Sequence, residues 1–114
     1  MKKLLFVTTV LFLSCAFSPQ KKTKIIFFGD SITELGVKEK PYRGYILELE
    51  DKSKAENKSD QYDCIGSGIS ANKVYDLYLR LEEDVLSKNP DVVFIYVGVN
   101  DVWHKTLLGT GTDA

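Results

Sequence analysis

Three short apolar runs alternate along the chain with segments of helical periodicity. Residues 24–29 are apolar without alternation, which is typical of a parallel strand covered on both faces, and 62–65 and 92–97 are two further short apolar runs. Each run leads into a loop that contains glycine. The pattern therefore predicts three parallel strands that are joined by helices.

Two helices are predicted between these strands. The first is expected to open at Pro41, because proline is tolerated at the first helical position, and to give way to a charged loop over 51–60. The second is expected to run through residues 74–85 and to stop before Asn89-Pro90, with Asp76 and Arg80 paired on its polar side. Its apolar face comprises Val74, Leu77, Tyr78, Leu81 and Val85.

Strand, helix, strand, helix, strand is the order of a doubly wound α/β layer with a parallel sheet. Right-handed crossovers place the loops after the three strands on one edge of that sheet. Ser31, the turn 66–71 and Asn100 are therefore expected to converge, although they lie far apart in the sequence.

The N-terminus has the pattern of an export signal. A short cationic start precedes an apolar run over 4–13, and small residues follow it. We assign 1–18 to a signal peptide, 19–23 to a linker and 24–114 to one domain. Cleavage after Ala16 or before Cys15 both fit, and the second would place a lipid on Cys15. The chain is expected to be periplasmic, secreted or lipid-anchored to a bacterial envelope.

The charge and cysteine content of the chain limit the classes of partner and bond that we expect. The chain has 114 residues and a net charge of -1, with 15 basic against 16 acidic residues and no basic stripe, so nucleic acid is not an expected partner. Cys64 has no obvious partner once Cys15 is assigned to the signal, and we expect a buried, inert thiol there.

Ser31 is the leading candidate for chemistry, because Gly29-Asp30-Ser31 ends the first apolar run and ligands bind at the carboxyl ends of parallel strands. A helix cap is an equally ordinary use of Asp or Ser at this place. If Ser31 is a nucleophile for acyl transfer, donors must face the oxyanion that develops. Its own N–H, an N–H of the second loop and the Asn100 amide are the candidates.

These residues resemble a known family. Gly29-Asp30-Ser31, a glycine-bearing second loop and Gly98-Val99-Asn100-Asp101, in that order, look like the SGNH or GDSL-type hydrolases. The resemblance implies a flavodoxin-like, three-layer α/β/α fold, a nucleophilic Ser31 and an oxyanion hole that includes Asn100. Alignment by the following helix puts Ala71 where the family has glycine, with Gly68 as the alternative donor.

The chain also departs from the family, which carries an Asp-x-x-His pair in a late loop. Neither residue is found at such a place, and the only histidine is His104. Serine is a weak nucleophile without a base. We therefore expect an N-terminal half of the domain, incomplete at the C-terminus, that is weak or inactive alone.

The family implies a small ester as substrate, such as an acetylated sugar, a lipid or a simple ester, and no cofactor or metal ion. Trp103 and His104 are candidates for substrate contacts. Two alternatives remain: a non-catalytic binding module that has lost its base, and a dinucleotide site, because residues 66–71 match G-x-G-x-x-A between a strand and a helix.

Overall fold

The computed structural model describes residues 20–111. Its centre is a three-stranded parallel sheet in the order β2-β1-β3, formed by β1 (Thr23–Gly29), β2 (Tyr62–Gly68) and β3 (Val92–Tyr96). Gly29 stands opposite Gly68 on one side and Tyr96 on the other. The three carboxyl ends therefore meet at one edge of the sheet, as the alternation of strands and helices predicts.

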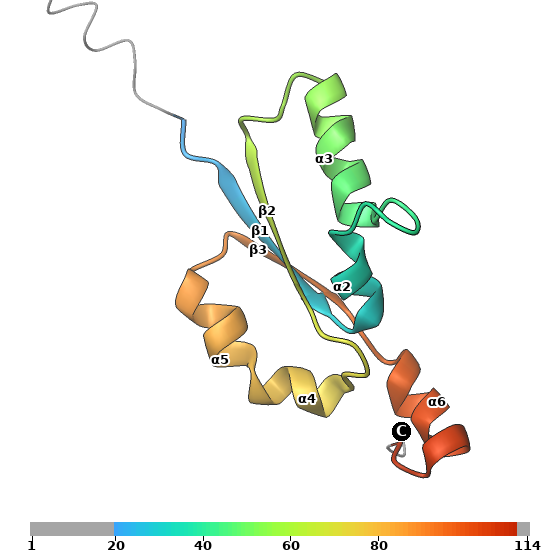
Figure 1. Ribbon diagram of the computed structural model, residues 1–114. Helices are drawn as coiled ribbons and strands as arrows, with labels where there is room; N and C mark the ends of the chain where they lie inside the picture. The colour runs from blue at the N-terminus through green and yellow to red at the C-terminus, as the bar shows by residue number, and fades with distance from the viewer. Residues whose placement is uncertain (1–19, 112–114) are drawn as a thin grey trace, which may run out of the picture.

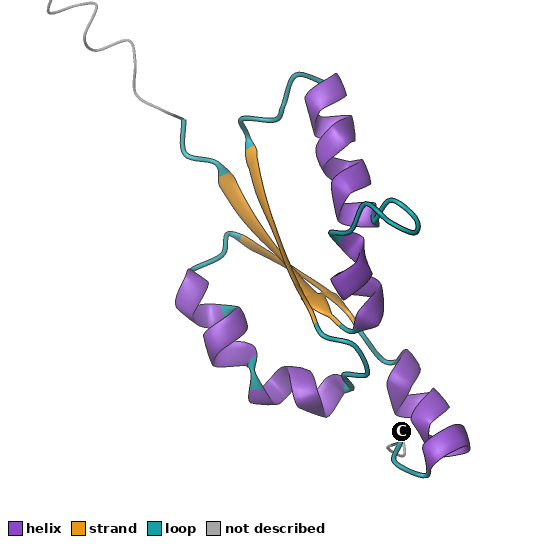
Figure 2. Cartoon of the chain, in the orientation of Figure 1, coloured by secondary structure: helices purple, strands orange, loops and turns teal. Residues whose placement is uncertain are grey.

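Helices cover the two faces of the sheet (Figures 1 and 2). On one face lie α2 (Ser31–Gly36) and α3 (Tyr45–Ala55), which connect β1 to β2. On the other face lie α4 (Val74–Leu79), α5 (Leu81–Asp84) and the short 3-10 helix η1 (Leu86–Lys88), which connect β2 to β3. The doubly wound α/β prediction is confirmed. After β3 the chain continues into α6 (Val99–Leu108).

Successive side chains of β1 pack on opposite faces of the sheet. Ile26 and Phe28 are buried against Leu77 and Val85 on the α4–α5 face. Phe27 points to the opposite face, where its ring meets Tyr45 of α3 edge-on at 5.8 Å between ring centroids. This alternation is the usual strand periodicity, and it anchors the strand that ends at Ser31.

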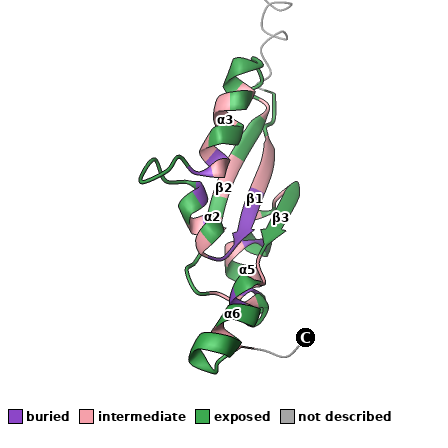
Figure 3. Cartoon of the chain, turned by 90° about the vertical axis from the view of Figure 1, so that its right-hand side faces the viewer, coloured by how far each residue is buried: buried purple, intermediate pink, exposed green. Residues whose placement is uncertain are grey.

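Burial differs sharply between the strands. In β1, Ile26 to Gly29 are buried, whereas all five residues of β3 are exposed (Figure 3). Like β2, β3 lies at an edge of the sheet and has a neighbouring strand on one side only.

Several predicted element bounds also differ. Pro41 does not open the first helix, which begins at Tyr45 after the N-cap Gly44 and extends to Ala55, into the segment expected to be a loop. The Gly44 N–H donates to Lys38 O at 2.8 Å and thereby folds the preceding loop back toward α2. Neither α2 nor α6 was predicted as a helix, because both lie where the sequence indicates strand-end loops.

The second helix is interrupted at Arg80 rather than continuous. Arg80 pairs with Asp84, not with Asp76, whose carboxylate instead accepts from the Lys73 N–H at 2.8 Å. The predicted Asp76–Arg80 pair is wrong because the arginine side chain turns toward the sheet.

The predicted signal peptide 1–18 and Cys15 lie outside the described residues. Within residues 20–111, no helix combines the length and the apolar character that crossing a membrane requires.

Candidate active site

Ser31 lies just after β1, at the start of helix α2, but Ser31 is not the residue that caps this helix. The N-cap of α2 is Asp30, a fully buried residue whose Oδ1 accepts from the Ile32 N–H at 3.0 Å. Ser31 follows as the first helical residue and is partly exposed. The capping explanation of Gly29-Asp30-Ser31 thus applies to Asp30, and the Ser31 hydroxyl is not needed for that task.

The second loop leaves β2 in close contact with α2. A Cβ on Gly68 would stand 2.0 Å from the Glu34 backbone nitrogen and 2.7 Å from Asp30 O. Gly68 is therefore needed for this close approach and lies within the strand. Three residues later Ala71 adopts φ +66°, a left-handed conformation that favours glycine. The residue aligned with the glycine of the family is thus held in a conformation that glycine adopts more readily.

Asn100 brings the third loop against the second. It lies in the first turn of α6, is 8% exposed, and its side-chain Nδ2 donates to Asn72 O at 2.9 Å. A primary amide carries two N–H donors. One Nδ2 hydrogen of Asn100 is donated to Asn72 O, and this bond fixes the plane of the amide. The direction of the second Nδ2 hydrogen is fixed as a result.

Backbone hydrogen bonds tie the three strand ends together. Asp30 N donates to Tyr96 O at 3.4 Å and Ile69 N donates to Gly29 O at 3.1 Å. Val74 N, at the start of α4, donates to the Asp101 carboxylate at 3.2 Å. The structure thus brings the loops that carry Ser31, Ala71 and Asn100 together at one edge of the sheet.

Glu34 adds a charged contact that the hydrophobic pattern does not single out. Its Oε2 accepts from both the backbone N–H, at 2.7 Å, and the hydroxyl of Ser70. These two hydrogen bonds hold the pKa of Glu34 below its usual range. The ionised Glu34 carboxylate therefore links helix α2 to the second loop. The role of Glu34 in this link is visible only from the tertiary contact.

Chemically, the edge combines a hydroxyl at a strand end with oriented N–H groups. The first N–H groups of a helix have no intrahelical partner, and Ser31 supplies one of them. The Ala71 N–H and the Asn100 amide lie on the loops that follow the two neighbouring strands.

The candidate substrate residues lie on α6. Trp103 is 57% exposed and His104 is partly exposed. The His104 carbonyl accepts from the Gly109 N–H and the Thr110 N–H and so closes the end of that helix. A hollow of about 250 Å³ beside α2 is lined by Ile32, the residue after Ser31, and by Tyr42.

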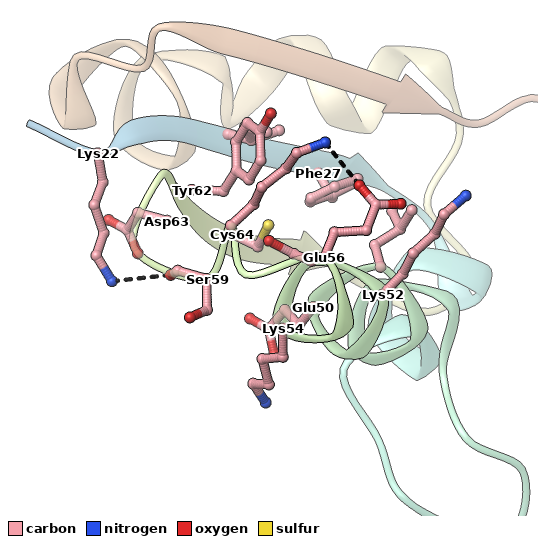
Figure 4. Close-up of a pocket in the computed structure, with 14 residues that line it drawn as sticks. Lys22, Phe27, Glu50, Lys52, Lys54, Glu56, Ser59, Tyr62, Asp63 and Cys64 are labelled. Carbon is pink, nitrogen blue, oxygen red and sulfur yellow. Dashed lines mark hydrogen bonds and ion pairs between the residues drawn. The ribbon is translucent and has the colours of Figure 1, made fainter.

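A cavity of about 540 Å³ lies elsewhere, between α3 and the first two strands (Figure 4). It is lined by Phe27, Tyr62 and Cys64 among others, and by none of the candidate site residues. Cys64 is partly buried rather than buried as predicted, and this partial burial raises the pKa of its thiol.

The geometry of residues 66–71 does not suit a dinucleotide. Gly66, Ser67 and Gly68 are strand residues paired with Phe27, Phe28 and Gly29. A dinucleotide fold instead needs its glycines in the tight turn that opens the helix. Here the helix begins only at Val74.

Known proteins resemble this chain in both sequence and structure. A curated acetylxylan esterase of Geobacillus stearothermophilus is 36% identical in an alignment of 91 residues that covers 72% of this chain and 41% of the esterase. The crystal structure of the acetyl xylan esterase AlAXEase is 62% identical with a TM-score of 0.74, over 79% of this chain and 44% of that one. A catalytic mutant of Axe2, an acetylxylan esterase from Geobacillus stearothermophilus, in which a serine is replaced by alanine, is 31% identical with a TM-score of 0.68, over 82% and 47%.

This chain thus spans less than half the length of each of these relatives. The model of the GDSL-like lipase/acylhydrolase family matches residues 27–113. That match covers most of the chain, from the middle of β1 to beyond α6, and the chain belongs to the GDSL-like lipase/acylhydrolase family.

Proposed function

We propose that this chain carries the nucleophile and the oxyanion donors of a serine ester hydrolase that removes acetyl groups from sugars. The observation that carries the proposal is the hydrogen bond from Asn100 Nδ2 to Asn72 O. It orients a buried amide at the strand edge where Asp30 caps α2 and leaves Ser31 exposed to a substrate.

In this mechanism Ser31 Oγ attacks the ester carbonyl, and the negative charge moves to the carbonyl oxygen. The N–H groups of Ser31 and Ala71 and the second Nδ2 hydrogen of Asn100 donate to that oxygen in the tetrahedral intermediate. The intermediate then breaks its bond to the sugar oxygen, which takes up the proton lost by Ser31 and leaves as an alcohol, while the acetyl group stays on Ser31 Oγ. Water then hydrolyses this ester, releases acetate and restores the Ser31 hydroxyl.

The proton of Ser31 needs a base, because the neutral hydroxyl is a weak nucleophile. His104 is the only histidine of the sequence. Asp101 and His104 have the spacing Asp-x-x-His, but they lie on α6 directly after β3 and not in a late loop, and the Asp101 carboxylate accepts from the Val74 N–H. The isolated chain is therefore expected to hydrolyse esters weakly or not at all.

Acetylated sugars are the favoured substrate class because the similar proteins are described as acetylxylan esterases. Exposed Trp103 on α6 and Tyr42 in the hollow beside α2 offer aromatic surfaces for a sugar ring. Lipids and simple esters are the competing substrates.

The test uses a hybrid in which this chain replaces the matching part of the acetyl xylan esterase that is 62% identical. The hybrid should release acetate from acetylated xylooligosaccharides. Ser31→Ala should abolish this release, and Asn100→Ala should lower the rate on the order of 10²-fold to 10³-fold, the usual cost of one oxyanion donor.

Ser59→Ala, in an exposed loop, is the matched control and should leave the rate unchanged. An active hybrid whose Ser31→Ala variant keeps full activity would contradict the mechanism. A folded hybrid that binds the oligosaccharide without hydrolysing it would favour the non-catalytic binding module.

A further inference from the structure

Arg80 is a partly buried charged residue that contacts the ends of β1 and β2 and the loop after β2. It stands at the break between α4 and α5, with φ −111° and ψ 9°, and its side chain is 14% exposed. The hydrophobic pattern predicts it on the polar, outer side of one helix. The structure instead directs its guanidinium under the sheet edge.

The guanidinium contacts the ends of two strands. Nη2 donates to Gly29 O at 2.8 Å, and Nη1 donates to Ser67 O at 3.2 Å. Its carbon lies 4.4 Å from the centre of the Phe28 ring, within the range of a cation–π contact. Arg80 therefore binds the last residue of β1, two positions before Ser31, and the end of β2 together.

The same side chain also reaches the second loop. Arg80 Nε donates to Asn72 Oδ1 at 2.8 Å, while the backbone carbonyl of Asn72 accepts from Asn100 Nδ2 at 2.9 Å. Asn72 directly follows Ala71. One residue thus links the arginine to two of the proposed oxyanion donors.

The charge of Arg80 is already balanced within the protein. Asp84 accepts a hydrogen bond from Nη1 and forms an ion pair with it. The remaining polar contacts are to backbone carbonyl oxygens, to the Ser67 hydroxyl and to the side chain of Asn72. This set of partners suits a residue that holds backbone in place, rather than one that binds an anionic substrate.

We propose that Arg80 is a positioning residue for the oxyanion site. It fixes Asn72, and through Asn72 the amide of Asn100, relative to the strand end that carries Ser31. The proposal rests on the function proposed above. A lysine should not replace it, since an ammonium is a point charge, whereas the planar guanidinium donates in several fixed directions at once.

The test is hydrogen exchange, followed by NMR, of the Asn100 side-chain amide in the isotope-labelled chain. Arg80→Lys should speed this exchange by about tenfold, the effect of weakening one hydrogen bond. Arg43→Lys is the matched control, because Arg43 makes its ion pairs with Glu39 and Asp51 near α3. It should leave the Asn100 signal unchanged.

A second control separates positioning from plain stability. Val85→Ala removes buried methyl groups from the core that Phe28 belongs to, and touches none of the hydrogen bonds of Arg80. It should lower the melting temperature and leave the chemical shifts of the Asn100 amide in place. Equal changes of those shifts in Val85→Ala and Arg80→Lys would overturn the proposal.

Should Arg80→Lys fail to fold, Asn72→Ser provides the decisive variant. It removes the Oδ1 acceptor of Arg80 and keeps the backbone carbonyl that binds Asn100, so the Asn100 exchange should still speed up. An unchanged exchange rate in a folded Asn72→Ser protein would overturn the proposal. Because exchange is measured without turnover, an inactive hybrid would contradict the proposed function and leave this result standing.

Discussion

Replacing Ala71 by glycine should stabilise the protein. Ala71 has φ +66°, and a left-handed conformation costs an L-residue about 1–2 kcal/mol relative to the right-handed one. Glycine relieves this cost, but it adds about 0.4–1 kcal/mol of conformational entropy to the unfolded chain. The difference is a net stabilisation of about 0.5–1 kcal/mol.

The assay is thermal and urea unfolding of Ala71→Gly beside two control variants. For a domain of this size the expected gain corresponds to a rise in melting temperature of roughly 2–8 °C. Ala55→Gly, at the end of α3, should destabilise by up to about 1 kcal/mol. Asn57→Gly should change little, because Asn57 has φ 56° and asparagine tolerates that region. A loss of stability in Ala71→Gly similar to that in Ala55→Gly would refute the reasoning.

Three further outcomes are expected. Gly68→Ala should lower the free energy of unfolding by about 1–3 kcal/mol in urea titration, because its Cβ would overlap the backbone of α2. Glu34→Gln should be less stable than the parent near pH 7. Since the folded pKa of Glu34 is lowered, this difference should vanish as the pH falls through that pKa in acid-dependent melting curves. Asp30→Ala should destabilise by about 1 kcal/mol or more in the same melting assay, because it removes the N-cap of α2, whereas Ser31→Ala should not.

The sequence predicts the sheet well because an apolar run is a local signal. Residues 24–29 are strand in both the prediction and the structure. The prediction stops β2 three residues early, at Ile65, because glycine and serine normally indicate a loop. Pairing with Phe27, Phe28 and Gly29 extends the strand to Gly68, and no local pattern contains that information.

The residues of the candidate site also fall into two groups, those that a local sequence signal indicates and those that only tertiary contacts reveal. Ser31, Ala71 and Asn100 could be named from motifs and from their places after strands, although their catalytic roles stay predictions. Glu34, Asn72 and Arg80 could not be named, because their roles depend on partners 28 to 51 residues away. The break at Arg80 was missed for the same reason, since the hydrophobic spacing of residues 74–85 passes through it unchanged.

The hydrogen bond of Asn100 has a consequence for the energetics of the proposed reaction. Its amide is held in the free protein by Asn72 O, so this dipole is oriented before any substrate arrives. In water, donors must turn toward a new negative charge, and that reorganisation contributes to the barrier. Here the cost of ordering is met once, during folding, and it does not recur with each turnover.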